Sequence, residues 1–232
     1  GEVLLQGNAL TLGGTGATVY VGVMSGSGKL VKSGASILTL SGSNTFSGGV
    51  DLSAGTIQFG NDSAFGTGLL SFTGGRILSD SVNDRTLMNA IAISGNLGLG
   101  DVVNSGVITM GGSIALAGDV TLTLLSGGTI SGAMDGAFGF TKSGNAELTL
   151  SGVNTSSGTL TVDAGVLSLV GGSAVADAAV VRVNEVGTLR LGAPEEIASL
   201  LGTGSVDLQS YSLTIGGAVG GNVFAGAIGG SG

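Results

Sequence analysis

The chain contains the same passage twice, first from Lys32 and again from Lys142. Between residues 32–55 and 142–165, 14 of 24 positions are identical without a gap. The match continues backwards at the same spacing, so that Gly22 faces Gly132. A chain that repeats a passage of this length without an insertion is using one structural solution again, as repeat proteins do.

A third, partial copy closes the chain. The sequence "FAGAIGGSG" from Phe224 resembles "YVGVMSGSG" from Tyr20. The passage breaks off inside this third copy, so we expect the chain to be part of a longer protein. We predict one continuous domain over residues 1–232, with repeat units at about 20–129 and 130–223 and a partial unit from 224.

Short runs of alternating apolar and polar residues predict strands rather than helices. In 120–124 and 148–150, valine and leucine alternate with threonine, which is the period of a half-buried strand. Glycine accounts for 48 of 232 residues and suits tight turns between strands. With 42% hydrophobic and 9% charged residues the chain should fold. No apolar run reaches the ~18 residues of a membrane helix, so we expect no membrane insertion by this segment.

Repeats and short strands together predict a parallel β-solenoid. A sandwich would need strands of unrelated sequence, whereas a solenoid stacks one coil on the next. The similar passages "NLGLGDV" and "IALAGDV" begin at Asn96 and Ile114, 18 residues apart. This short period suits one coil of two or three short strands. At roughly 18–25 residues a coil, we expect about 9–13 coils in a rod roughly 45–60 Å long.

One segment breaks the strand pattern. Residues 194–201, "PEEIASLL", begin with the chain's one proline, followed by two glutamates. Proline at the first position and acids in the first turn are typical of a helix N-terminus. We therefore expect a short helical turn inserted at this place.

Three passages carry a family resemblance. Residues 26–77 and 138–169 resemble the passenger-associated repeat of bacterial autotransporters, and 195–217 resemble the segment that commonly separates two copies. The resemblance implies a single-stranded right-handed parallel β-helix. It also implies export through the outer membrane of a Gram-negative bacterium, with display at the cell surface or release. The second copy departs from the first where "NDSAFGTG" has become "GGSAVADA", so the loop chemistry there is not shared.

Composition excludes several kinds of site. The net charge is −8 and the seven basic residues are scattered, which disfavours nucleic acid as a partner. Without histidine or cysteine, the common nucleophile–histidine pairs and thiolate or imidazole metal sites cannot form. Lys32–Ser33 and Lys142–Ser143 are adjacent, but neighbours along a strand point to opposite faces. We expect both lysines at solvated coil corners, no catalytic residue and no cofactor.

Two aspartates are the candidates for a metal or catalytic pair. Asp101 and Asp119 close the two similar passages that suggest one coil, so they could stack in adjacent coils. Stacked carboxylates would raise a pKa or attract a cation, and glycan hydrolysis needs two acids about 5–10 Å apart. Both aspartates follow a glycine, however, where aspartate commonly bonds to the local backbone. The turn interpretation is favoured.

Residues that break the repeat are candidates for ligand contact. Phe46 lies in a turn-like stretch, and its counterpart in the second copy is Ser156, so the repeat does not require a ring there. Asp80, Asp84 and Arg85 form a charged spot in a loop that we expect to be solvated. The insert at 194–201 belongs to the same group.

Other recurrent residues are expected to be structural. Asn44 and Asn154 hold the same repeat position at a predicted corner, where asparagine can bond to its own backbone or to a neighbouring asparagine in the next coil. Residues 61–63 lack the spaced acids of a calcium loop and are interpreted as turn formers. Phe59 and Phe72 fall on strands and should lie in the core.

Scaffold features dominate the chain, so we predict a non-enzymatic β-helical stalk or adhesin segment. Its partners would be the neighbouring coils of the same chain and a host surface protein, a glycan or a second copy of itself. Two alternatives stay open. A polysaccharide-acting enzyme would show a groove with converging acids of shifted pKa. A cytotoxin passenger or a self-assembling surface fibre would show an exposed apolar stripe along the rod.

Overall fold

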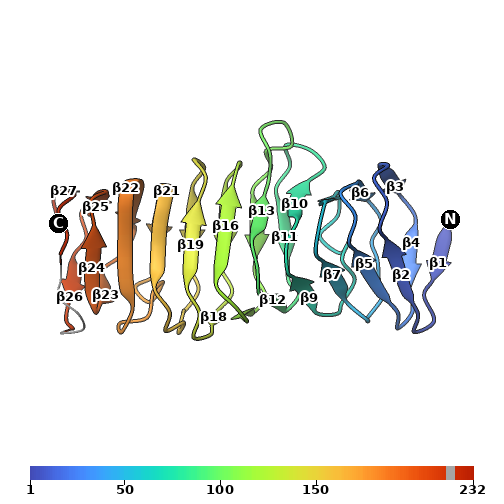
Figure 1. Ribbon diagram of the computed structural model, residues 1–232, viewed down its shortest axis with the longest axis horizontal. Helices are drawn as coiled ribbons and strands as arrows, with labels where there is room; N and C mark the ends of the chain where they lie inside the picture. Colours follow the sequence, from blue (N-terminus) through green and yellow to red (C-terminus); the bar gives the residue numbers. More distant parts are fainter. Residues whose placement is uncertain (218–222) are drawn as a thin grey trace.

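The structure, a computed structural model, describes residues 1–217 and 223–232 as an all-β rod (Figure 1). The strands pair in parallel with strands of the adjacent coils, and the coils make about 11 turns. Neither described range contains a helix, and so neither holds one that is long and apolar enough to cross a membrane. The predicted parallel β-solenoid is confirmed.

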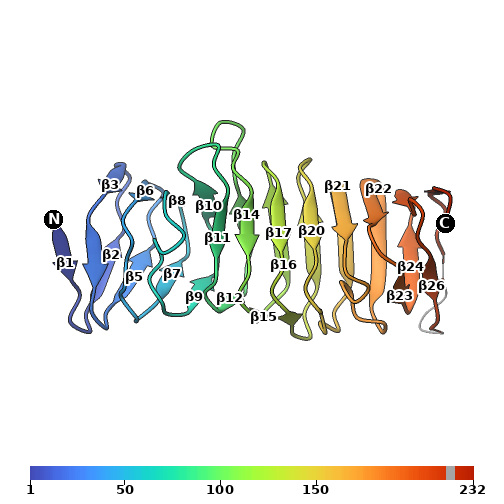
Figure 2. The same ribbon diagram turned by 180° about the vertical axis from the view of Figure 1, so that it is seen from behind.

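The strands of the coils lie on three faces, as Figures 1 and 2 show from opposite sides. The first face is a seven-stranded sheet; the second and third faces belong to one sixteen-stranded sheet. The first face holds β2 (Ala9–Leu12), β5 (Lys29–Lys32), β7 (Val50–Leu52), β9 (Leu70–Phe72), β12 (Ile91–Ile93), β15 (Ile114–Leu116) and β18 (Met134–Asp135).

The sixteen-stranded sheet bends because its longest strands cross from one face to the next. Its second-face strands are β3 (Thr18–Tyr20), β6 (Ile37–Leu40), β8 (Thr56–Phe59), β10 (Arg76–Ser79), β13 (Leu97–Leu99), β16 (Val120–Leu124), β19 (Phe140–Ser143) and β24 (Ser199–Gly202). Its third-face strands are β11 (Arg85–Leu87), β14 (Ile108–Met110), β17 (Gly128–Ile130), β20 (Leu148–Leu150), β25 (Ser205–Asp207) and β27 (Ala227–Gly229). The long strands β21 (Leu160–Leu169) and β22 (Val180–Leu191) span both faces.

Two short sheets stand beside these faces near the ends of the rod. In the first, β1 (Glu2–Leu4) pairs with β4 (Val23–Ser25). In the second, β23 (Glu195–Ile197) pairs with β26 (Leu213–Ile215).

The register between strands sets the length of a coil. Leu30 lies opposite Val50, and Val50 lies opposite Leu70, so equivalent positions of regular coils are twenty apart in the sequence, as Met24 and Asn44 also are. The shorter period predicted from Asn96 and Ile114 is wrong, because the two similar passages lie on different faces: β13 is on the second face and β15 is on the first. Their likeness reflects similar strands and turns in one coil and the next, not stacking.

The two repeat copies also lie on different faces. Strand β5 of the first copy belongs to the first face, whereas the equivalent strand β19 belongs to the second. This shift follows because the distance along the chain from Lys32 to Lys142 is not a whole number of regular coils. The partial third copy lies on the same face as the equivalent part of the first copy. Phe224 forms a β-bridge with Gly202 on the second face, and its equivalent in the first copy, Tyr20, also lies on that face.

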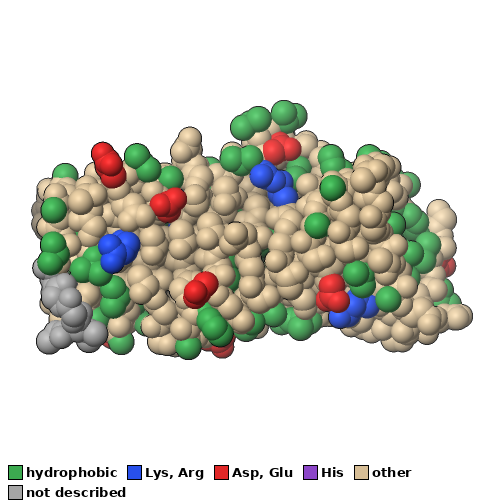
Figure 3. Space-filling model, in the orientation of Figure 1, with side chains coloured by type: hydrophobic (Ala, Val, Ile, Leu, Met, Phe, Trp, Pro, Cys, Tyr) green, Lys and Arg blue, Asp and Glu red, His purple; other side chains and the backbone are tan. Residues whose placement is uncertain are grey.

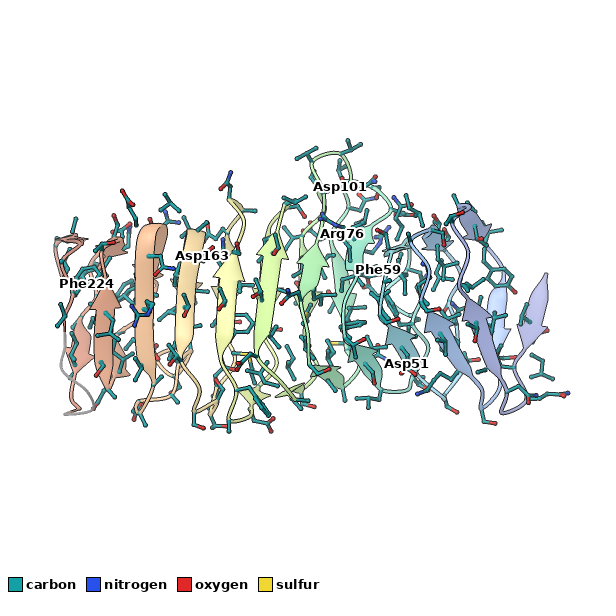
Figure 4. All side chains as sticks on the ribbon, in the orientation of Figure 1. Asp51, Phe59, Arg76, Asp101, Asp163 and Phe224 are labelled. Atoms are coloured by element: carbon teal, nitrogen blue, oxygen red, sulfur yellow. The ribbon has the colours of Figure 1, made fainter. Side chains whose placement is uncertain are left out.

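Inward-facing residues stack coil on coil to form the core. On the first face Leu30, Val50, Leu70 and Ile91 are in register and essentially inaccessible to solvent. Burial of apolar surface contributes roughly 25 cal/mol for each Å², so these columns are the main source of stability. Phe59 and Phe72 are fully buried, as predicted, and Figure 4 shows Phe59 on its strand.

Phe46 is part of this core and not a ligand contact. Its side chain is 0% exposed, and its ring packs beside Gly66 of the next coil. The stretch that we expected to be an exposed turn alternates like a strand, with Asn44 and Phe46 inside and Thr45 outside. The surface position predicted for this ring is therefore wrong.

Residues 194–201 form strands instead of a helical turn. The N–H of Glu195 donates to Ser212 O in the following coil, and β23 pairs with β26. On the other side, the Glu195 carboxylate accepts bonds from Ala174 N at 3.4 Å and Val175 N at 3.0 Å. The backbone of this segment pairs with both neighbouring coils, through β23 with β26 and through β24 with β22. This pairing outweighs the weak helical preference of the sequence.

Asn44 and Asn154 connect three successive coils from inside the rod. The Oδ1 atom of Asn154 accepts a bond from Met134 N at 2.8 Å, and its Nδ2 atom donates to Ala174 O at 2.7 Å. Asn44 makes the same two bonds to the coils before and after its own, at 2.7 and 2.6 Å. The structural role predicted for this repeat position is confirmed.

The two lysines predicted at solvated corners are buried. Lys32 and Lys142 are both 0% exposed and lie where the adjacent coils carry Leu52 and Leu122. Lys142 Nζ donates to Gly144 O at 2.5 Å and to Ala164 O at 2.6 Å. Lys32 makes the equivalent bonds to Gly34 O and Ala54 O. Each ammonium thus satisfies two carbonyls of a coil corner from inside.

The buried ammonium of Lys142 should make stability depend on alkaline pH. Burial lowers its pKa from 10.5 to about 8, although Asp163 and Glu147 partly oppose the shift. Between these values the unfolded chain binds more protons than the folded chain, so stability should rise with pH, by at most about 3 kcal/mol. Below pH 8 both states are protonated and this contribution is flat.

Urea unfolding from pH 7 to 11 checks this expectation. The variant Lys142→Met is the control, because it lacks the titrating group while other basic groups still contribute. A smaller rise in the variant than in the parent chain is expected. Parallel curves for the two proteins would contradict the assignment.

Candidate functional site

The regular coil is enlarged in one region of the second face. Arg76 pairs with Gly98, and Leu97 pairs with Leu122. Both pairs are further apart along the chain than the pairs of regular coils, so these two successive coils are longer than the regular ones. The additional residues lie in the loops 80–84 and 101–106, which follow β10 and β13 and project from the rod (Figures 1 and 2). We call these two loops the loop knob.

Hydrogen bonds and one ion pair hold the loop knob together. Arg85 Nη2 lies 3.1 Å from Asp80 Oδ1, and Arg85 Nε donates to Phe59 O at 3.2 Å. Asp84 Oδ1 accepts a bond from Val107 N at 2.8 Å, which joins the first loop to the residue that follows the second loop. The three charged residues predicted for ligand contact are thus brought together, and each is bonded within the protein.

Three valine side chains form the apolar part of the accessible surface of the loop knob. Val82 is 70% exposed, Val102 is 82% exposed and Val103 is 73% exposed. Figure 3 shows hydrophobic atoms at the tip of the projection, with acidic and basic groups beneath them. These valines are missed by a search for charged or aromatic residues. The signal that could have found them is the extra length of these two coils relative to the regular coils.

Asp101 and Asp119 do not stack on each other. Asp101 follows β13, at the base of the loop knob (Figure 4), whereas Asp119 precedes β16 at the opposite edge of the second face. Asp101 Oδ1 accepts bonds from Val103 N at 2.7 Å and Asn104 N at 2.6 Å, which is the local turn bonding favoured above. Across 1–217 and 223–232, no three acidic side chains gather in a way that could hold a metal ion.

The remaining polar residues of interest also serve the backbone. Asn61 Oδ1 accepts a bond from Ser63 N at 2.8 Å, as expected of a turn. Burial raises the pKa of Glu195, which borders a hollow of about 310 Å³ together with Asp177 and Glu196. Both carboxylate oxygens of Glu195 accept backbone N–H groups, so this buried acid supports the coil corner.

A groove of about 630 Å³ lies at the other edge of the second face, away from the loop knob. It runs over the first residues of β16, β19 and β21. Hydroxyl groups line it, with Asp119 as its charged residue. Of its lining residues, the sequence patterns had singled out Asp119 as a site candidate, and the groove itself was not predicted.

Comparisons with known proteins agree with this architecture. Residues 30–59 and 140–169 match the family described as Passenger-associated-transport-repeat. The chain is 32% identical over 248 residues to the Adhesin BmaC autotransporter of Brucella suis biovar 1 (strain 1330). That alignment covers 96% of this chain and 7% of the relative's length, so the chain corresponds to a small part of that protein. No solved structure matches the chain.

The matched repeats coincide with the strands that carry the two buried lysines, β5 and β19. Similarity to the adhesin runs along nearly the whole chain. Passengers of this kind are displayed at the surface of Gram-negative cells or secreted. The chain is a repeat-bearing passenger segment of an autotransporter.

Proposed function

We propose that this segment is a non-enzymatic stalk that also makes adhesive contact through the loop knob. The observation that carries the proposal is the group of exposed valines on a projection of an otherwise regular rod. Exposed apolar side chains that gather in one patch are typical of protein interaction sites, whereas single ones are common on any surface. The similarity to a protein named as an adhesin supports the same function.

The partner that fits the loop knob is a host surface protein with an apolar socket and a basic rim. Val82, Val102 and Val103 would enter the socket, where burial of each valine favours binding. Asp84 and Asp101 lie in the same loops and carry the opposite charge to such a rim.

A stalk function is supported by the way the carboxylates are used. Asp80 pairs with Arg85, while Asp84, Asp101 and Glu195 accept bonds from backbone N–H groups. An enzyme acting on glycans would need two free acids that converge on one cleft. Asp177, Glu195 and Glu196 border one hollow, but both carboxylate oxygens of Glu195 accept backbone N–H groups. We therefore propose scaffolding and adhesion, not catalysis.

Adhesion of beads coated with the purified chain to cultured epithelial cells tests the proposal. The triple variant Val82→Ser, Val102→Ser and Val103→Ser should lower the number of attached beads about tenfold or more, because three apolar contacts are lost. The matched control replaces Val21, Val153 and Val186, which are 72%, 64% and 72% exposed elsewhere on the rod, with serine.

The control variant should attach as well as the parent chain. Equal loss in both variants, or no loss in either, would contradict adhesion through the loop knob. Attachment that occurs only between coated beads would show self-association and would overturn the choice of a host protein.

A further inference from the structure

The groove on the second face has the size and lining of a binding site. Its volume of about 630 Å³ lies within the range of small-ligand sites, roughly 300–1,000 Å³. The side chains of Thr121, Thr141 and Thr161 are in register in three successive coils, so their column follows the rod axis. Ser157 and Thr159 add two further hydroxyl groups.

These hydroxyl groups are not used inside the protein. Within the described chain, the five side-chain hydroxyls of the groove make no hydrogen bond, whereas Thr39 donates to Gln58 and Ser168 to Glu147. A hydroxyl can donate and accept, so a row of them matches a ligand that presents hydroxyls of its own. Asp119 uses Oδ1 to accept a bond from Gly139 N at 2.8 Å, which leaves Oδ2 as a further acceptor.

The residues that line the groove disfavour anionic and strongly apolar ligands. An anion would be repelled by Asp119 and by the net charge of −8. A strongly apolar ligand would find Ala137 and little else, because Val120 is only 2% exposed. The chemistry that remains is a neutral ligand rich in hydroxyl groups.

The first repeat copy carries the same surface in a closed form. Lys29 stands where the second copy has Gly139, and Asp51 stands where it has Thr161. Lys29 Nζ reaches Asp51 Oδ2 at 2.9 Å, so this ion pair covers the place that is open in the second copy. This ion pair is one of the differences that separate the covered surface from the groove. Val31 and Gly49 also stand in the first copy where the groove has Thr141 and Thr159.

Gly139 is not required by the backbone. It lacks the positive φ found at Gly144 and Gly165. The nearest atoms to a Cβ built at Gly139 are Asp119 Oδ1 at 3.3 Å and Thr159 O at 3.6 Å, and the aspartate side chain lies at the surface and can move. The missing side chain therefore creates space for a ligand without being needed for the fold.

We propose that this groove binds a segment of a neutral glycan, laid along the rod axis over the column of threonines. The chain has few exposed aromatic rings to stack on sugars, so hydrogen bonds supply the recognition and the affinity of one groove is modest. The groove is separate from the loop knob, and glycan binding is an addition to the adhesive function proposed above.

Calorimetric titration with neutral hexasaccharides, maltohexaose and cellohexaose, tests the proposal, with a heparin hexasaccharide as the charged comparison. The variant Gly139→Lys with Thr161→Asp copies the ion pair of the first repeat and should weaken binding of the neutral sugar tenfold or more. Thr141→Val keeps the shape of the side chain and removes one hydroxyl, so it should weaken binding about threefold. Thr109→Val on the third face is the matched control and should change nothing.

Thermal unfolding of each variant is compared with that of the parent chain to show that the variant is folded. If the double variant does not fold, the binding of neutral sugar by Thr141→Val still tests the proposal. No binding of either neutral sugar, or equal binding by Thr141→Val and parent, would overturn the proposal. Bead adhesion is measured on the same preparations. Adhesion without sugar binding would overturn the groove alone, and sugar binding without adhesion would overturn only the role of the loop knob.

Discussion

Replacing Phe46 with alanine should lower the free energy of unfolding by about 3–5 kcal/mol, as for other buried aromatic rings. The ring is 0% exposed and packs beside Gly66 of the adjoining coil. The residue before Gly66, Phe65, packs edge-on against Phe59 with ring centres 5.0 Å apart. The columns of the core are continuous, so a cavity left here borders several coils. Urea unfolding followed by circular dichroism measures the change.

Phe138→Ala is the control for this prediction. That ring is 43% exposed, so its loss should change stability by only about 0.5 kcal/mol. A stable Phe46→Ala protein with weakened ligand binding would instead support a surface role for Phe46 and contradict its place in the core.

Replacing Asn154 with leucine should cost about 2–5 kcal/mol, because each buried polar group left unsatisfied costs about 1–3 kcal/mol. Leucine has a similar volume but leaves Met134 N and Ala174 O without their partners inside the rod. Asn44→Leu should have an effect of the same size, because Asn44 makes the same two bonds in its own repeat. Urea unfolding measures both variants.

The exposed neighbour Thr155 provides the control for this second prediction. Thr155→Val should leave the urea midpoint nearly unchanged, since its side chain points outward and valine suits a strand. If Asn154→Leu and Thr155→Val unfolded at the same urea concentration as the parent, the bonds between the coils would not carry the stability assigned to them.

The sequence was sufficient to predict the architecture because repetition and alternation are both local patterns. It was insufficient for the position of each copy, since that depends on the length of a coil. With regular coils of twenty residues, the second copy lies on a different face from the first. The shorter coil predicted from Asn96 and Ile114 did not indicate this difference. Strand pairing across coils likewise outweighed the helical signal at 194–201.

The errors at individual residues have one cause. The positions of Lys32 and Phe46 were predicted from residue type alone. The charged lysine was expected to face solvent, and the isolated aromatic ring was expected to contact a ligand. Their positions two places after Leu30 and Asn44 put them on the inward side of the chain, as alternation requires. The lysine is accepted inside because Gly34 O and Ala54 O need a donor there, and no sequence pattern announces such carbonyls.

The different faces occupied by β5 and β19 have a consequence for contact with a cell. A rod that lies lengthwise against a flat surface touches it along one side only. The covered surface around Lys29 and the open groove around Gly139 cannot then both meet that surface, and rolling the rod about its long axis exchanges one for the other. Orientation alone would therefore decide whether the groove is pressed against a target or left open to soluble glycans.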